Sequence, residues 1–228
     1  MRNHLENEAF RWKTKKTRGG ALTNSDVLAA PEMASQNHVA PSLHDKLRDA
    51  TAAVHQRMHG HDGFGAIKAG TIDTTSYTQL LCRLYGFYRP FERETGQGDA
   101  RSRWLVQDLD SLGLDESRRR IILDCAEIPR LQTAQRRLGA LYVVAGSALG
   151  GRHLARGLDK LFPFGQTAGR HFFLGHGAQT GAVWRNYLAR LASVPRDLHT
   201  QAEIVNAATE TFAVFERWAA GWKGAAHG

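Results

Sequence analysis

The sequence predicts an all-α protein with a single domain, on the strength of three observations. Apolar residues recur at three- and four-residue spacings in several long stretches, which is the period of amphipathic helices. The alternation of apolar and polar residues that is typical of strands does not extend over any useful length. The chain has 228 residues, of which 42% are hydrophobic, so it can bury one sizeable core. A helical bundle is therefore the expected architecture.

The first 40 residues are expected to be a disordered basic extension, because they hold six Lys or Arg against four acids and little apolar periodicity. The domain is expected to span residues 41–224. Met33 precedes the first predicted helix by about ten residues, so we expect it to be the natural start and residues 1–32 to be an artefact of start-site assignment. No signal-peptide pattern is visible, and Cys82 and Cys125 lack a CxxC spacing, so we expect a reduced, cytoplasmic protein.

The first helix is predicted from Leu43 to Met58. At about 100° per residue, one face carries an apolar stripe and its flank carries polar groups. The stripe consists of Leu43, Leu47, Ala50, Val54 and Met58, and the flank of His44, Arg48, Thr51, His55 and His59. Arg48 and His55 lie two turns apart, roughly 10 Å, which approximates the reach from a heme iron to its propionates. A neutral imidazole can ligate heme iron and an arginine fork suits a carboxylate, but a histidine beside an apolar stripe is also commonly a packing residue.

Further helices follow from the same periodicity. They are predicted from Tyr77 to Phe91 with a cap at Asp73 and a kink or end at Pro90, from Trp104 to Leu112, from Asp115 to just before Pro129, from Val183 to Leu191, and from Ile204 to Trp218. The helix that begins at Asp115 is expected to bury Ile121, Ile122 and Cys125.

Residues 138–161 have a helical apolar pattern with glycine at positions 139, 146, 150, 151 and 157. Each glycine costs a helix about 1 kcal/mol relative to alanine. The missing side chains therefore make room for something: a kink that brings bare backbone against a ligand, or close packing against a neighbouring helix. Charged residues in this run, and the lack of 18 consecutive apolar residues in the chain, make a membrane-spanning segment the weakest interpretation.

Three segments resemble the heme oxygenase family, in the same order along the chain. They are Leu47-Arg-Asp-Ala-Thr-Ala-Ala-Val-His55, Tyr77 to Glu92, and Leu141-Tyr-Val-Val-Ala-Gly-Ser-Ala-Leu-Gly-Gly151. The resemblance covers about residues 43–222 and is nearest to the bacterial biliverdin-producing branch associated with bacteriophytochromes. It implies a helical bundle in which a proximal histidine and a kinked, glycine-rich distal helix face each other across heme. The implied reaction converts heme to biliverdin, carbon monoxide and ferrous iron.

On this resemblance, His55 is the iron ligand, and heme is both substrate and cofactor. Arg48 and, on a looser alignment, Arg185 fall near basic positions that face the propionates. Gly146 and Gly150 match the distal glycines that let dioxygen bind in a tight space, and Ser147 would anchor a water that delivers a proton. The other predicted ligand contacts are Thr51, Tyr142 and Gly151. Tyr142 is equally consistent with packing in the core.

The chain departs from the family at two positions next to the predicted chemistry. Four residues after the proximal histidine the family often has a carboxylate, and here it is His59; many relatives have a distal aspartate where this chain has Ser147. A heme-binding or heme-trafficking protein that leaves the ring intact therefore stays open as an alternative. So does a different ligand or a metal site at His55, His59 and His61, although the sequence His-Gln-Arg-Met-His is not the HExxH motif.

The net charge of +8 bears on the partners. Its basic clusters, Arg118 to Arg120 and Arg136-Arg137, lack interleaved aromatic residues and any recognition motif, so we expect no nucleic-acid partner. The reaction that the resemblance implies needs dioxygen and an external electron donor, such as a ferredoxin or a flavoprotein reductase. Positive surface potential would speed the encounter with an acidic donor.

Overall fold

Helices make up all the regular secondary structure of residues 40–98, 100–163 and 165–223, which are the residues that the computed structural model describes. The elements are α1 (Leu43–His59), α2 (Asp62–Ala69), α3 (Thr74–Thr95), α4 (Ala100–Ser111), α5 (Glu116–Arg120), α6 (Ala134–Gly157), α7 (His171–Leu174), the 3₁₀ helix η1 (Gly177–Gln179), α8 (Thr180–Ala192) and α9 (Leu198–Ala220). The all-α prediction is confirmed. Residues from Ser42 onward group as one compact unit, whereas the expectations for residues 1–39 and for Met33 lie outside the described residues.

The α1 helix begins with a capping box, in which the Ser42 hydroxyl and the Asp45 carboxylate each accept from the other residue's backbone amide. Its buried face carries Leu43, Leu47, Thr51 and Val54. The predicted stripe was wrong at Ala50, which is exposed, because the stripe turns through Thr51 instead. A threonine can be buried there since its hydroxyl donates to the backbone oxygen of Leu47, at 2.8 Å.

The α3 helix begins at the predicted cap, where Asp73 accepts from the Ser76 amide at 2.7 Å. It does not end at Pro90 but runs on to Thr95. Pro90 has no amide hydrogen, so the carbonyl of Gly86, four residues earlier, is free of its usual helical partner. That carbonyl accepts from the backbone amide of Cys125, at 2.8 Å, and so ties a distant loop to the middle of α3.

The helix predicted from Asp115 to Pro129 is much shorter than expected. Asp115 does cap it, accepting from the Arg118 amide at 2.9 Å, but α5 ends at Arg120. Ile122 and Cys125 are buried from a non-helical segment, and Ile121 is 58% exposed. Periodicity could not distinguish this segment from a helix, because Ile122 and Cys125 have the three-residue spacing of a helix face. The segment is held instead by the hydrogen bond from the Cys125 amide to the Gly86 carbonyl of α3.

The buried residues form two clusters. The larger, here called the α3 core, surrounds Tyr77, Leu81, Phe87 and Phe91. The second, here called the α1 core, lies among α1, α6, α8 and α9 and consists of Leu43, Leu47, Val54, Leu138, Tyr142, Val143, Tyr187, Leu191, Ile204, Ala208 and Phe212. The predicted site residues of α1 lie at the edge of this α1 core.

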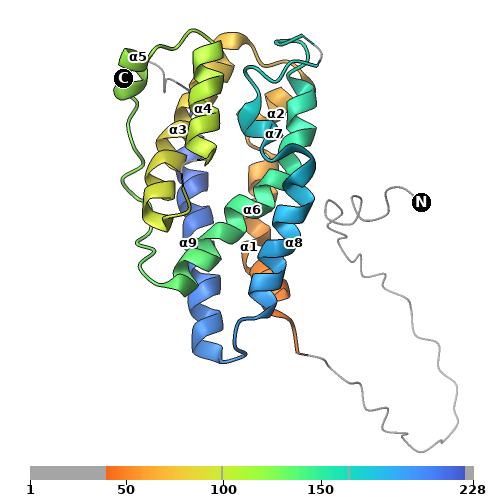
Figure 1. Ribbon diagram of the computed structural model, residues 1–228, viewed down its shortest axis with the longest axis vertical. Coiled ribbons are helices and arrows are strands. Elements are labelled where there is room, and N and C mark those ends of the chain that lie inside the picture. Colours follow the sequence, from red (N-terminus) through yellow and green to blue (C-terminus); the bar gives the residue numbers. More distant parts are fainter. Residues whose placement is uncertain (1–39, 99, 164, 224–228) are drawn as a thin grey trace, which may run out of the picture. The chain divides into compact units, whose positions relative to one another are not determined.

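The α6 helix connects the two cores. It packs along α9, and it also contacts α2, α7 and α8. In Figure 1 its first half slants across α9 and its second half stands more upright beside α7, as expected for a kinked, glycine-rich helix. The short α7 is held over the second half by Asp108 of α4, whose buried carboxylate accepts from the amides of His171 and Phe172 at 2.7 and 2.8 Å.

Candidate functional site

His55 lies on α1 beside the α1 core, with its ring half-buried. The ring centroid is 6.3 Å from that of Phe212 on α9 and 4.6 Å from that of His59, one turn further along α1. Burial, and then the charge that His59 can carry, lowers the pKa of His55. The imidazole is therefore neutral at pH 7 and keeps the lone pair with which a histidine ligates a metal.

Thr51, one turn before His55, connects α1 to α6. The phenol of Tyr142 lies beside the hydroxyl of Thr51, whose own proton goes to the Leu47 carbonyl. Both side chains are buried, and burial raises the pKa of Tyr142, so the phenol stays protonated at neutral pH. Tyr142 is thus the residue of α6 that lies next to the middle of α1.

The contact between Tyr142 and Thr51 also indicates where His55 lies along α6. Figure 1 shows α1 and α6 running in the same direction, since both rise from the end of the bundle where α9 begins. Four residues beyond Thr51 is His55, and four residues beyond Tyr142 is Gly146. One helical turn advances both chains by about 6 Å. We therefore expect the imidazole and Gly146 to lie at about the same level of α1 and α6.

The glycines of α6 serve different purposes. Three of them lie where a Cβ would clash with a backbone carbonyl of a neighbouring element: Gly139 with Ile204, Gly151 with Phe173, and Gly157 with Ile67. Close packing explains these positions, and the ligand contact of Gly151 stays a prediction. Gly146 is different, because a Cβ there would meet only the Trp184 ring at 3.9 Å, an ordinary van der Waals distance. Packing does not require a glycine at 146, so the space beside it can serve a ligand.

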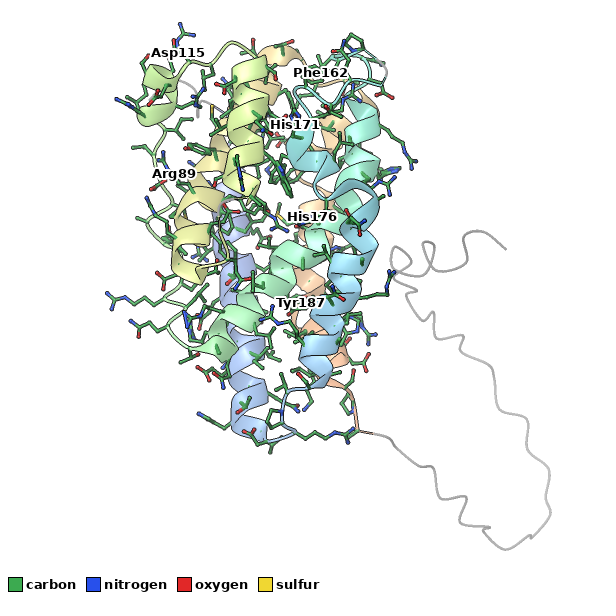
Figure 2. All side chains as sticks on the ribbon, viewed as in Figure 1. Arg89, Asp115, Phe162, His171, His176 and Tyr187 are labelled. Carbon is green, nitrogen blue, oxygen red and sulfur yellow. The ribbon has the colours of Figure 1, made fainter. Side chains whose placement is uncertain are left out.

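Aromatic rings line α8 next to this space. The Trp184 ring is stacked on Tyr187, with centroids 5.5 Å apart, and lies 5.9 Å from the rings of both Tyr142 and His44. Tyr187, labelled in Figure 2, donates to the Leu138 carbonyl at 2.9 Å and so fixes α8 to α6. The sequence indicated Tyr187 as a core residue but gave no sign that His44 joins the ring cluster.

The two predicted carboxylate-binding arginines lie on α1 and α8, the helices that carry His44 and Trp184 of this cluster. Arg48 is half-buried on α1, and its guanidinium pairs with Asp45 at 2.9 Å and Asp49 at 3.0 Å. Arg185 is exposed on α8, with its guanidinium 3.5 Å from where a Cβ on Gly181 would be. Arg48 would have to exchange these partners in order to bind a propionate.

Arg101 and Tyr88, which the sequence analysis did not assign to the site, lie beside the turn of α6 that contains Gly146 and Ser147. Ser147 is exposed and donates to the Val144 carbonyl at 3.0 Å. The same carbonyl accepts from the guanidinium of Arg101, on α4, at 3.1 Å. Tyr88 of α3 is buried, and its phenol lies beside Ser147, which lowers the pKa of Tyr88 against the larger effect of burial. Tyr88 stood inside a segment of the resemblance, whereas nothing in the sequence placed Arg101 near α6.

The alternative metal site at His55, His59 and His61 is not formed. Both ring nitrogens of His61 are engaged, one accepting from the Phe64 amide at 3.4 Å and the other bonded to the Ala219 carbonyl at 3.1 Å. In the described part of the chain no group of three or more His, Cys, Asp or Glu side chains could hold a metal ion. No helix in these residues is both long and apolar enough to cross a bilayer.

Two grooves stand out on the described residues, and neither contains a predicted site residue. One, of about 770 Å³, lies between the start of α3, the loop around Ile122 and the C-terminal turn at Trp218. The other, of about 370 Å³, lies between Lys46 and the first turns of α9. Groove size alone would therefore point away from His55, whereas the donor chemistry and the α6 glycines point toward it.

Comparisons with known proteins give a consistent result. Residues 41–220 match the family described as Heme oxygenase. A heme oxygenase of Xanthomonas campestris pv. campestris is 32% identical over 161 residues, which is 66% of this chain and 92% of the relative. Among solved structures, heme oxygenase-1 of Synechocystis in complex with heme has a TM-score of 0.65 at 19% identity, covering 82% of this chain and 95% of its own. The heme oxygenase of Leptospira interrogans has a TM-score of 0.60 at 17% identity, with coverages of 79% and 99%.

Proposed function

Because the chain belongs to the heme oxygenase family, we propose that it cleaves heme oxidatively to biliverdin, carbon monoxide and ferrous iron, using dioxygen and an external electron donor. The observation that carries the proposal is the pairing of His55 with Gly146. A neutral imidazole on α1 would stand level with Gly146 of α6, where the described surroundings give no packing reason for a glycine. Bound heme would supply the redox chemistry, and the protein would hold and orient it.

His55 would ligate the iron through the lone pair of its neutral ring. The α1 core behind it fixes the helix, because Leu47 and Val54 are buried on the adjacent face. The contact between Tyr142 and Thr51 would set the distance between α1 and α6 one turn away from the iron. Heme would then fit between the ring of His55 and the bare backbone of Gly146.

On the α6 side, Gly146 and Gly150 would leave room for dioxygen. Ser147 is exposed beside this space and lies next to the Tyr88 phenol, so the two hydroxyl groups would anchor a water and pass a proton. This arrangement supports a route for protons that does not need the distal aspartate of many relatives.

The propionates of heme would be held by Arg48, whose present carboxylate partners are exposed and therefore cheap to exchange. Arg185 would contribute more weakly, from the exposed face of α8. We further propose a cytoplasmic location and an acidic donor such as a ferredoxin, or a flavoprotein reductase. The net charge of +8 supports attraction of an acidic partner.

The test compares His55→Ala with His59→Ala in protein reconstituted with hemin. Wild-type and His59→Ala proteins should give the Soret band of a histidine-ligated heme, and His55→Ala should lose it while keeping its helical circular dichroism. With a reductant and dioxygen, the wild-type complex should lose the Soret band and form biliverdin. A normal spectrum in His55→Ala would refute the assigned ligand.

The same measurement decides between degradation and heme carriage. His59 and Ser147 replace side chains that are carboxylates in many relatives, which favours a carrier as the second candidate function. Heme that is bound through His55 but stays intact under reductant and dioxygen would establish that candidate and overturn oxidative cleavage.

A further inference from the structure

The α6 helix has one carbonyl, that of Val144, with two side-chain donors. The guanidinium of Arg101 reaches it from α4 at 3.1 Å, and the hydroxyl of Ser147 from the same helix at 3.0 Å. Two extra donors on a buried helical residue are expected where a helix changes direction and its own amide pairing is weakened. Arg101 therefore holds the turn of α6 on which Gly146 lies.

The backbone of α4 presents Arg101 to α6 in a fixed way. Glu92 of α3 is buried, and its carboxylate accepts from the backbone amides of Arg101 and Ser102 at 2.8 and 3.1 Å. Because Glu92 is engaged in capping α4, it does not pair with the guanidinium. Among the described residues no carboxylate forms an ion pair with the Arg101 guanidinium. Against the larger effect of burial, the charge of Arg101 lowers the pKa of Tyr88, and the Glu92 carboxylate raises it by a smaller effect.

The charge of Arg101 acts on the same groups as the predicted proton route. Its guanidinium carbon lies 5.9 Å from the centre of the Tyr88 ring, and the Tyr88 phenol lies beside Ser147. His176, labelled in Figure 2, lies on the other side, where burial and then the charge of Arg101 lower its pKa. Arg101 thus brings a positive charge from α4 close to Ser147, the position of α6 at which many relatives of this chain carry an aspartate.

We propose that Arg101 is the positioning residue of the distal turn of α6, holding the Val144 carbonyl and giving the space beside Gly146 and Ser147 a positive potential. This inference rests on the proposed function in one respect, namely that heme binds between α1 and α6. A positive potential stabilises an anionic ligand at that place and has little effect on a neutral one. A carboxylate on α6 would have the opposite effect.

The experiment measures ligand binding to the ferric heme complex of Arg101→Met, Arg101→Lys and wild-type protein. Azide serves as the anionic probe and imidazole as the neutral probe. We expect Arg101→Met to weaken azide binding roughly ten-fold and to change imidazole binding less than about two-fold. Arg101→Lys should recover most of the azide affinity, because it keeps the charge. Equal changes for both probes, or none, would show that Arg101 gives no such potential.

A matched control and a second measurement separate this inference from heme binding itself. Arg103→Met removes an equal charge from the exposed face of the same helix and should leave azide binding unchanged; the same loss in both variants would overturn the proposal. In the protein without heme, Arg101→Met should speed hydrogen exchange of the amides of residues 146–149, and unchanged exchange would overturn the role at Val144. If wild-type protein binds no heme, the proposed function fails, and the exchange measurement still decides the role of Arg101 on α6.

Discussion

The ring of Trp184 lies 3.9 Å from the point that a Cβ at Gly146 would occupy, so α6 has room for an alanine there. The opposite holds one turn later, where a Cβ at Gly151 would lie 2.6 Å from the Phe173 carbonyl oxygen. The two glycines belong to one motif in the sequence, yet only Gly151 is required by the packing of its neighbours. Substituting each by alanine should therefore have opposite effects on stability.

Gly146→Ala is expected to stabilise the protein without heme by up to about 1 kcal/mol, because alanine favours a helix over glycine and nothing blocks the methyl group. The same methyl group would occupy ligand space, so heme affinity and turnover should fall. Urea unfolding and a hemin titration measure the two effects. Gly151→Ala, the control, should lose about 1–3 kcal/mol through overpacking. A loss of stability in both variants would contradict the open space at Gly146.

Releasing Arg48 from its carboxylates should strengthen binding of the heme propionates. Asp49→Asn removes a partner that is exposed, and exposed ion pairs contribute about 0.2–1 kcal/mol, so heme affinity should rise by a factor of roughly 1.4 to 5. Protoporphyrin dimethyl ester, loaded with iron, has no carboxylates and should bind both proteins equally. A rise for both ligands would mean that Asp49 acts through the helix instead of through Arg48.

Sequence reasoning predicted those parts of the fold where one helix face decides burial. The helices containing His55, Phe87, Tyr187 and Phe212 are all present, because their apolar residues recur every three or four positions over several turns. The predicted helix was wrong at Ile122, because the buried residues Ile122 and Cys125 belong to a loop that is hydrogen-bonded to the Gly86 carbonyl. A tertiary backbone bond of this kind leaves no periodic signal.

The candidate site was predictable only in part, for a related reason. His55, Gly146 and Ser147 came from local motifs, and the structure adds that Tyr142 and Thr51, one turn before Gly146 and His55, lie beside each other. Arg101 was missed because its partner is a backbone carbonyl on α6, 43 residues away in the chain. Contacts made to backbone carry no side-chain pattern that a single sequence can show.

Gly86→Ala is expected to destabilise the protein severely, by about 3 kcal/mol or more. A Cβ there would clash with the Leu123 carbonyl and lie 2.8 Å from the Trp218 ring, so both the loop and α9 would have to move. The matched control is Gly65→Ala in α2, where a Cβ meets nothing within 4 Å and stability should rise slightly. Chemical unfolding of both variants measures the difference. A mild effect at Gly86 would mean that the loop is not held by the middle of α3.

The two cysteines should be unreactive in the folded protein. Both are buried, and burial raises the pKa of the Cys82 thiol to about 11 and also raises that of Cys125. Since the thiolate is the reactive form, roughly one Cys82 in a thousand is ionised at pH 8. Labelling with iodoacetamide at pH 8 should be negligible until urea unfolds the chain, when both thiols should react. In the folded state the rate should rise about ten-fold per pH unit from pH 8 to 10.

Cys82→Ser isolates the second thiol and provides the control for this experiment. Cys82 borders the 770 Å³ groove although its own side chain is fully buried, so it is the thiol more exposed to a fluctuation of the C-terminal turn. The backbone amide of Cys125 donates a hydrogen bond to the Gly86 carbonyl, which holds Cys125 in place, so its labelling should follow global unfolding. If the single thiol of Cys82→Ser reacted rapidly at pH 8 in native protein, the loop from Ile121 to Cys125 would have to open independently of α3. That outcome would contradict the anchoring of this loop by the free carbonyl four residues before Pro90.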